Sequence, residues 1–245
     1  MTTQRLHITG LNKAFTLHAQ GGIHLPVLDT LNLSIDDGEC VVIEGPSGQG
    51  KSTLLKLIHA NYRATSGAIA LRRSSDEWID VVQASEPELL DIRQNDIGYV
   101  SQFLRVIPRI SALDVVAEPL LDMWQPNHGD KSAREQALSA ARDEARLWLA
   151  KLRIPESLWG LPPATFSGGE QQRINIARSL IRPRPLMLLD EPTASLDKAN
   201  AETVVELILA LRSTGCAVLG IFHDTEVRER VATRKVSISQ LRSAV

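Results

Sequence analysis

The spacing of apolar residues predicts strands in the first part of the chain and alternating helices and strands later. Residues 5–11 and 28–35 alternate apolar with polar positions, as half-buried strands do. The runs 40–43 and 186–189 are apolar without alternation, which is typical of parallel strands covered on both faces. Further strands are expected at 68–71, 78–82, 97–100 and 217–222.

Helical spacing predicts four helices among these strands. Residues 51–60 carry apolar side chains at helical intervals, and residues 132–152 place an alanine- and leucine-rich face opposite Arg and Glu. Two more helices are expected at about 168–181 and 199–213. The stretch 154–165 contains three prolines and predicts a loop. Together these elements predict an α/β core with a helical insertion.

Composition narrows the class of protein. The 245 residues carry 27 Lys and Arg against 29 Asp and Glu, and this net charge of −2 gives no reason to expect a nucleic-acid partner. The longest apolar runs fall far short of the roughly 18 residues of a membrane-spanning helix. Cys40 and Cys216 have no metal-ligand spacing, so we expect two small core side chains in a reducing compartment. The expected protein is cytoplasmic and globular, with no segment inserted in a membrane.

The first candidate site is a glycine-rich loop between a predicted strand and a predicted helix. The stretch Gly45-Pro46-Ser47-Gly48-Gln49-Gly50-Lys51-Ser52, followed by Thr53, fits the phosphate-binding pattern G-x-x-x-x-G-K-[ST]. Its glycines let the backbone wrap closely around phosphate, and the backbone N–H groups at the helix start favour an anion. Lys51 is predicted to reach the terminal phosphates, and the Ser52 hydroxyl to bind Mg²⁺.

Two carboxylates and a histidine follow later strands of the same sheet. Asp190 closes the buried run at 186–189, where an open α/β sheet places its ligands, and is predicted to hold Mg²⁺ through its water shell. Glu191 is next to it and could activate the attacking water as a general base. His223 follows the strand at 217–222 and could contact the γ-phosphate or orient the water. A histidine in this position is also often purely structural.

A further segment, Ser167-Gly168-Gly169-Glu170-Gln171, resembles the signature motif of ATP-binding cassette (ABC) ATPases. Glu170 stands where that motif most often has glutamine. The resemblance implies that the signature of one subunit completes the ATP site of a second, in a head-to-tail dimer. Three more motifs of the family are matched in order: Gln102 resembles the Q-loop glutamine, which touches Mg²⁺ and water, Ser195-Leu196-Asp197 the D-loop, and His223-Asp224 the H-loop. Phe15 resembles the aromatic residue that stacks on adenine, with a loop expected at 18–26 after it.

The resemblance covers nearly the whole chain and implies one nucleotide-binding domain of the P-loop NTPase class. A RecA-like parallel sheet and an antiparallel β subdomain would occupy about 1–102 and 183–245, with a helical subdomain at about 103–182. ATP and Mg²⁺ are the implied cofactors. The stretches 102–113, 60–62, 76–78 and 220–224 further resemble the PhnL family, the ABC-type subunits of bacterial carbon–phosphorus lyase systems.

Three functional hypotheses follow. The first is an ATPase whose dimer closure drives a soluble phosphonate-processing assembly, at the step that makes a ribose-linked phosphonate triphosphate. The second is the ATPase subunit of a membrane transporter, either a phosphonate importer or an exporter of the lipoprotein or macrolide type, because the region from Gln102 to Ser111 resembles those cassettes as well. The third is a nucleotide-gated clamp whose slow hydrolysis only resets it.

Overall fold

A computed structural model describes residues 3–17, 22–104, 109–123 and 131–241, and these residues form two compact units. The first unit comprises the described parts of Met1–Tyr99, Arg184–Asp190 and Leu209–Val245. The second comprises those of Val100–Pro183 and Glu191–Ile208. The helical subdomain expected from the sequence spans about 103–182, and the second unit also includes residues 191–208.

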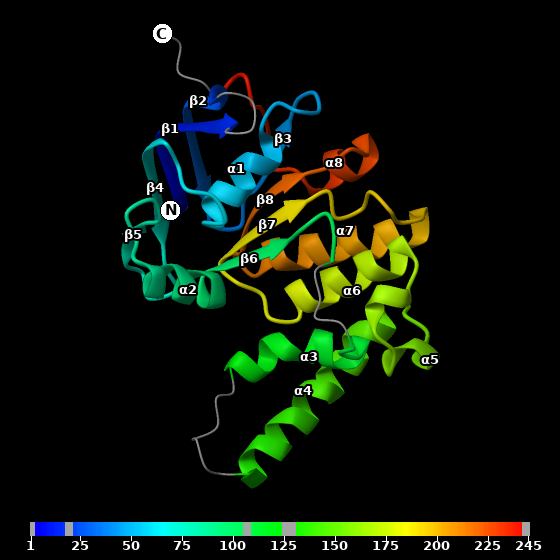
Figure 1. Cartoon of the computed structure of the whole chain (residues 1–245). Coiled ribbons are helices and arrows are strands. Elements are labelled where there is room, and N and C mark those ends of the chain that lie inside the picture. Colours follow the sequence, from blue (N-terminus) through cyan, green and yellow to red (C-terminus); the bar gives the residue numbers. More distant parts are fainter. Residues whose placement is uncertain (1–2, 18–21, 105–108, 124–130, 242–245) are drawn as a thin grey trace. The chain divides into compact units, whose positions relative to one another are not determined.

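The first unit contains a four-stranded antiparallel sheet in the order β2-β1-β4-β5 (Figure 1). Its strands are β1 (Gln4–Leu17), β2 (Ile23–Asp36), β4 (Ser66–Arg72) and β5 (Trp78–Asp80). The expected loop at 18–26 is wrong for its last residues, because β2 already begins at Ile23 and pairs with Leu17. Pro26 is tolerated in this strand because β2 lies at the edge of the sheet, where one row of backbone N–H groups has no strand partner.

The second sheet has five strands in the order β6-β7-β8-β3-β9. They are β3 (Cys40–Glu44), β6 (Ile97–Val100), β7 (Leu186–Asp190), β8 (Ala217–Ile221) and β9 (Arg234–Ser237). β3 pairs in parallel with β8 and β9, and β7 pairs in parallel with β8. Every residue of β7 and β8 is buried, and the unbroken apolar run at 186–189 predicted this for β7. These pairings align the carboxyl ends of β3, β7 and β8 at one edge.

The helices of the first unit are α1 (Lys51–Ile58), α2 (Glu86–Asn95) and α8 (Thr225–Val231). The apolar face of α1 joins both sheets in one hydrophobic core, which includes Leu54 and Leu57 of the helix, Ile8 of β1 and Leu188 of β7. This shared core fixes the start of α1, and with it the glycine-rich loop, against the parallel sheet.

The second unit is helical. It contains α3 (Ala112–Met123), α4 (Lys131–Lys151), α5 (Glu156–Trp159), α6 (Gly168–Leu180) and most of α7 (Lys198–Ser213). α3 packs against α4 and α6. An ion pair of 2.7 Å joins Arg142 to Asp114 and, with the hydrogen bond that they share, lowers the pKa of the aspartate. The predicted loop at 154–165 is only partly correct, because it holds α5 and a 3-10 turn at Pro163–Thr165.

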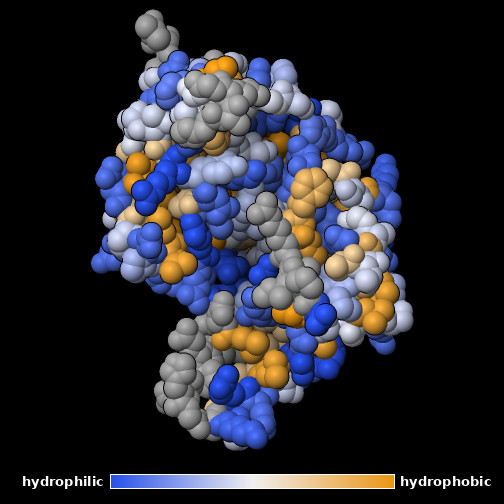
Figure 2. Space-filling view, viewed as in Figure 1, coloured by the Kyte–Doolittle hydropathy of each residue, from blue (hydrophilic) through white to orange (hydrophobic). Residues whose placement is uncertain are grey.

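The surface is mixed in hydropathy, and Figure 2 shows apolar residues on this face as separate patches among polar ones. Among the described residues, no helix combines the length and apolar character needed to cross a membrane. The most exposed large apolar side chains are Phe103, Leu147 and Leu90. Cys40 and Cys216 are buried free thiols, and burial raises the pKa of each to about 12, as expected for side chains that serve in packing.

A partly buried histidine predicts one feature of the stability of the first unit. His59, just after α1, lies against the ring of Tyr99 with 5.1 Å between ring centroids. Burial lowers the pKa of His59 from 6.5 to about 4. Between pH 6.5 and 4, His59 is therefore protonated in the unfolded chain but still neutral in the folded chain. The free energy of unfolding falls by roughly 3 kcal/mol as the pH falls through this window.

Urea unfolding at pH 7 and pH 4 tests this prediction. The wild type should lose about 3 kcal/mol more than the His59→Leu variant over the same interval. Equal losses in the two proteins would show that His59 does not titrate differently in the folded and unfolded chains.

Candidate functional site

The glycine-rich loop connects the end of β3 at Glu44 to the start of α1 at Lys51. Gly50 has a φ of 89°, in the left-handed region, and a Cβ there would lie 2.8 Å from a methyl group of Val27. Only glycine suits this position, because a side chain would strain the backbone and collide with Val27. Its carbonyl accepts from the N–H of Leu54, which closes the first turn of the helix, so the N–H groups of the turn before it stay available for an anion.

Lys51 is held close to the loop backbone. Its side chain is buried to 8% exposure, and its Nζ donates to the carbonyl oxygens of Gly45 at 2.7 Å and Pro46 at 2.8 Å. The ammonium charge is thus fixed beside the loop and at the positive end of α1. This is the environment that a bound polyphosphate needs.

Asp190 lies at the carboxyl end of β7 and is 4% exposed. Ser52 Oγ donates to its Oδ1 at 2.9 Å, and the hydroxyl of Tyr99 donates to its Oδ2 at 3.0 Å. Each carboxylate oxygen therefore holds one hydroxyl group. Sequence reasoning found Ser52 and Asp190 but missed Tyr99, which no motif marks.

The oxygen donors of Ser52 and Asp190 suit Mg²⁺. Among the described residues there is no cluster of three or more His, Cys, Asp and Glu side chains that could enclose a metal ion. Magnesium does not need one, because it keeps several waters and takes the rest of its oxygen ligands from one or two side chains and the substrate phosphates. A hydroxyl that bonds to a buried carboxylate, next to a phosphate-binding loop, is the donor set of such a site.

His223 follows β8 at the same edge of the parallel sheet. Asp190 pairs with Ile221 across the two strands, which places His223 two residues beyond the neighbour of Asp190. His223 is exposed, and the next residue, Asp224, caps α8 by accepting from the N–H of Val227 at 3.1 Å. The first unit thus brings the loop, Asp190 and His223 to one sheet edge.

Phe15 lies on β1 of the first unit, opposite Leu25 of β2. The ring of Tyr62 packs edge-on against it with centroids 5.4 Å apart, and the ammonium group of Lys13 lies 4.6 Å from its centroid. Tyr62 is a second aromatic neighbour that the sequence did not indicate. A partly exposed, cation-supported aromatic ring is suited to stacking on a planar base.

Glu191 belongs to the second unit and has an unusual backbone. Its φ is 55°, in the left-handed region that residues with a side chain rarely adopt and that concentrates at functional sites. Gln102 donates from Nε2 to Oε2 of Glu191 at 3.2 Å. The second unit therefore pairs the Q-loop glutamine with the predicted general base, although 89 residues separate them in the chain.

The signature segment forms the start of α6. Ser167 is the N-cap. The Glu170 carboxylate accepts from the backbone N–H of Ser167 at 2.9 Å and from the Ser167 hydroxyl at 2.7 Å. These bonds lower the pKa of Glu170 and explain how a carboxylate can stand where glutamine is usual. A Cβ on Gly169 would lie 2.9 Å from the carbonyl oxygen of Ser195, so the signature and the D-loop are in close contact.

Asp197 caps α7. It accepts from the backbone N–H and the side-chain amide of Asn200, both at 2.8 Å, and the first of these bonds does most to lower its pKa. Asp197 thus stabilises the turn that leads from the D-loop into α7. The second unit holds Gln102, Glu191, the signature and Asp197, and the first unit holds the other predicted site residues.

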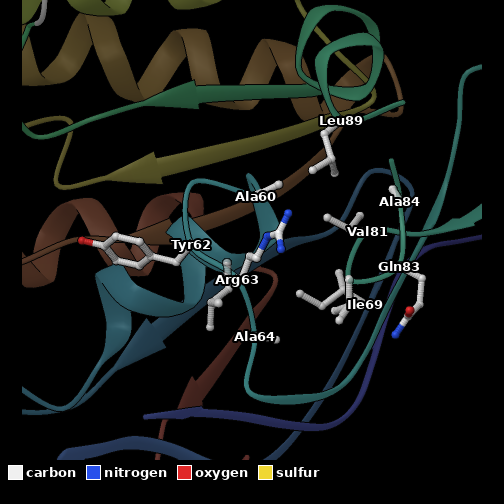
Figure 3. A pocket seen from close by; sticks show the side chains of 11 residues that line it. Ala60, Tyr62, Arg63, Ala64, Ile69, Val81, Gln83, Ala84 and Leu89 are labelled. Atoms are coloured by element: carbon white, nitrogen blue, oxygen red, sulfur yellow. The ribbon is translucent and has the colours of Figure 1, made fainter. Parts of the chain in front are cut away.

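A cavity of about 240 Å³ lies elsewhere in the first unit, and Figure 3 shows its lining. Leu57, Ile69, Val81 and Leu89 supply apolar walls, and Arg63 adds a charged group. The cavity is smaller than typical ligand pockets, which start at roughly 300 Å³. None of the predicted site residues lines it.

Comparison with known proteins identifies the family. The family model described as "ABC transporter" matches residues 28–194. The Bacillus subtilis "Uncharacterized ABC transporter ATP-binding protein YvrO" is 34% identical, over 95% of this chain and 93% of its own length. The "Lipoprotein-releasing system ATP-binding protein LolD" of Aquifex aeolicus is 34% identical over 83% of each chain.

A solved structure shares the fold as well. The post-hydrolysis dimer of the ATP-binding cassette MJ0796 bound to ADP and Pi, from Methanocaldococcus jannaschii, has a TM-score of 0.81 and 30% identity, and covers 95% of this chain and 93% of its own. These relatives confirm the predicted cassette fold with its parallel and antiparallel sheets. The names of these relatives refer to transport or release systems, and none of them refers to a carbon–phosphorus lyase. The closer resemblance to carbon–phosphorus lyase subunits is therefore not shown. The chain belongs to the ABC transporter family, as an ATP-binding cassette that hydrolyses ATP with Mg²⁺.

Proposed function

We propose that the chain is an ATPase subunit in which two cassettes close around ATP and thereby drive a conformational change in a partner assembly. The observation that supports this best is the glycine-rich loop with buried Lys51, placed at the sheet edge where Asp190 and Ser52 meet. Positive charge for phosphate and hard oxygen donors for Mg²⁺ are thereby combined in one unit. A chain that only binds nucleotide would not require the Gln102–Glu191 pair of the second unit as well.

In the first unit we assign the loop residues 45–53 to the phosphates of ATP. Lys51 exchanges its loop carbonyl partners for the terminal phosphates, and Phe15 stacks on adenine. Ser52 and Asp190 would hold Mg²⁺, which would neutralise charge on the phosphates when bound. His223 contacts the γ-phosphate from the end of β8.

In the second unit we assign Glu191 to activation of the attacking water, with Gln102 orienting its carboxylate. Ser167, Gly168, Gly169 and Glu170 contact the ATP held by a second cassette, because the start of α6 presents backbone N–H groups and a hydroxyl to an anion. Asp197 keeps the D-loop backbone in place beside them. The MJ0796 relative is described as a dimer with ADP and Pi bound, which supports an assembly of two cassettes.

The relatives favour a membrane transporter as the partner assembly. The LolD relative is described as part of a lipoprotein-releasing system, and its match extends over most of both chains. In this reading the partner is a permease that contacts the segment after Gln102, where Phe103 is 72% exposed. Residues 105–108 of that segment lie outside the described residues.

A second candidate partner is a soluble phosphonate-processing assembly of the carbon–phosphorus lyase type. The stretch from Gln102 to Leu113 favours it, together with residues 60–62 and 220–224, which resemble the cassettes of that system. The cassette would then supply ATP-driven closure at the step that converts an alkylphosphonate and ATP into a ribose-linked phosphonate triphosphate with release of adenine, and other subunits would supply the covalent chemistry.

Affinity purification of the tagged chain from its native host separates these candidates. The experiment uses detergent-solubilised membranes and soluble extract in parallel, each with and without the non-hydrolysable ATP analogue AMP-PNP. Nucleotide-dependent recovery of a permease supports transport, and recovery of phosphonate-processing subunits from the soluble extract supports the second candidate. Recovery of neither partner under any condition would contradict the proposal that the cassette drives a partner assembly.

A further inference from the structure

Tyr99 occupies a position in the first unit that no assigned role explains. It lies on β6, the strand next to β7, and its hydroxyl donates to Oδ2 of Asp190 at 3.0 Å. Asp190 is 4% exposed, so this carboxylate is nearly cut off from water and depends on protein donors. Tyr99 supplies one of the two hydroxyl groups that it binds.

The two hydroxyl groups restrain the carboxylate at both ends. Ser52 Oγ bonds to Oδ1 and Tyr99 bonds to Oδ2, so rotation of the Asp190 carboxylate would break at least one bond to an ionised acceptor. Such charge-assisted bonds are stronger than bonds between neutral groups. The orientation of Asp190 is therefore set before any ligand binds.

The tyrosine ring is itself held in place. It packs against the ring of His59, with centroids 5.1 Å apart and an interplanar angle of 35°. His59 is the C-cap residue of α1, and burial lowers the pKa of its ring to about 4, so the ring is uncharged at neutral pH. The contact with His59 restrains the Tyr99 ring, and the hydrogen bond to Asp190 restrains its hydroxyl.

We infer that Tyr99 is a positioning residue for Mg²⁺ binding, which acts by orienting the Asp190 carboxylate toward the metal ion. The inference rests on the proposed roles of Asp190 and Ser52. Groups that orient a metal ligand through hydrogen bonds typically contribute about 10–100-fold to metal affinity. Tyr99 does not contact the nucleotide in this account, so nucleotide binding without metal should not depend on its hydroxyl.

Mn²⁺ titration followed by electron paramagnetic resonance tests this role, with the full-length protein saturated with AMP-PNP. Tyr99→Phe keeps the ring and its contact with His59 and removes only the hydroxyl. We expect it to weaken Mn²⁺ binding by about 10–100-fold, with AMP-PNP affinity in EDTA equal to that of the wild type. Ser75→Ala removes a different hydroxyl of the first unit, one that bonds to Glu77, and should leave Mn²⁺ binding unchanged.

A double-mutant comparison distinguishes orientation of the carboxylate from a general structural effect. In an Asp190→Asn background the ionised acceptor is gone, so adding Tyr99→Phe should change Mn²⁺ affinity by less than about twofold. Mn²⁺ affinity of Tyr99→Phe within twofold of wild type, or an undiminished effect in the Asp190→Asn background, would overturn the inference. A wild-type protein that binds neither AMP-PNP nor Mn²⁺ would instead contradict the proposed function.

Discussion

Replacement of Glu191 by glutamine should slow ATP hydrolysis by about 10²–10⁴-fold, the usual contribution of a general base, while ATP still binds. Glutamine has nearly the same shape and can keep a hydrogen bond to Gln102, but it cannot accept a proton from the attacking water. The strained backbone at φ 55° is the same in both proteins, because both residues carry a side chain of the same branching. The change therefore isolates the chemistry of the carboxylate.

Phosphate release under single-turnover conditions measures this effect, and equilibrium dialysis with labelled ATP measures binding. Glu206→Gln is a matched control, because Glu206 is an exposed residue of α7 in the same unit. It should hydrolyse ATP at the wild-type rate. Hydrolysis by Glu191→Gln within about threefold of wild type would assign the general base to another residue or to the substrate itself.

Replacement of Lys51 by alanine should act at an earlier stage and weaken ATP binding itself. Removal of one partner of a buried, charged contact typically costs about 2–5 kcal/mol, which corresponds to a rise in Kd of roughly 30- to 5,000-fold. The loss should be largest for ATP and smaller for AMP, because Lys51 is assigned to the terminal phosphates. Binding of both nucleotides by equilibrium dialysis gives the comparison.

Two controls keep the Lys51 experiment interpretable. Lys51 also donates to the carbonyl oxygens of Gly45 and Pro46, so the thermal unfolding midpoint of the variant shows whether the loop and helix survive its loss. Lys56→Ala removes a lysine one turn later in α1 and should bind ATP normally. Equal ATP affinity in folded Lys51→Ala and wild type would remove the loop from the nucleotide site.

The sequence predicted the central strands of the parallel sheet well because they are buried on both faces, but it missed the half-exposed strand β9. Residues 186–189 form an unbroken apolar run, residues 217–222 were predicted as a strand, and β7 and β8 are buried throughout. The start of α1 at Lys51 was equally predictable, because the glycine-rich loop requires a helix to begin there. At β7, β8 and the start of α1, the local sequence pattern therefore predicts the same structure that tertiary packing produces.

Prediction was less successful where the decisive contact is distant or the pattern is weak. α2 has little amphipathic character, and its local signals are the capping box formed by Ser85 and Glu88 and a proline near its start, which the apolar pattern does not show. β2 extends to Ile23 through pairing with β1, although Ile23 and Leu25 are exposed and Pro26 interrupts the pattern. Cross-strand hydrogen bonds decide this extension, and they have no signature within a single strand.

In the candidate site, too, features set by neighbouring residues were predictable and features set by distant contacts were not. The residues of the glycine-rich loop are adjacent in the chain, so their spacing alone carries the chemistry. Tyr99 lies 91 residues from Asp190 in sequence, and only the pairing of strands brings its hydroxyl to the carboxylate. The left-handed backbone of Glu191 and the capping role of Glu170 likewise follow from three-dimensional structure.

The central claim is that two copies of this cassette share ATP across their interface, and the mass of the Glu191→Gln protein in solution tests it most directly. Size-exclusion chromatography with light scattering gives this mass with Mg-ATP and with EDTA. The account predicts a species of twice the 26.9 kDa chain mass with Mg-ATP and a single chain in EDTA. A protein that retains bound ATP and still elutes at 26.9 kDa would contradict it.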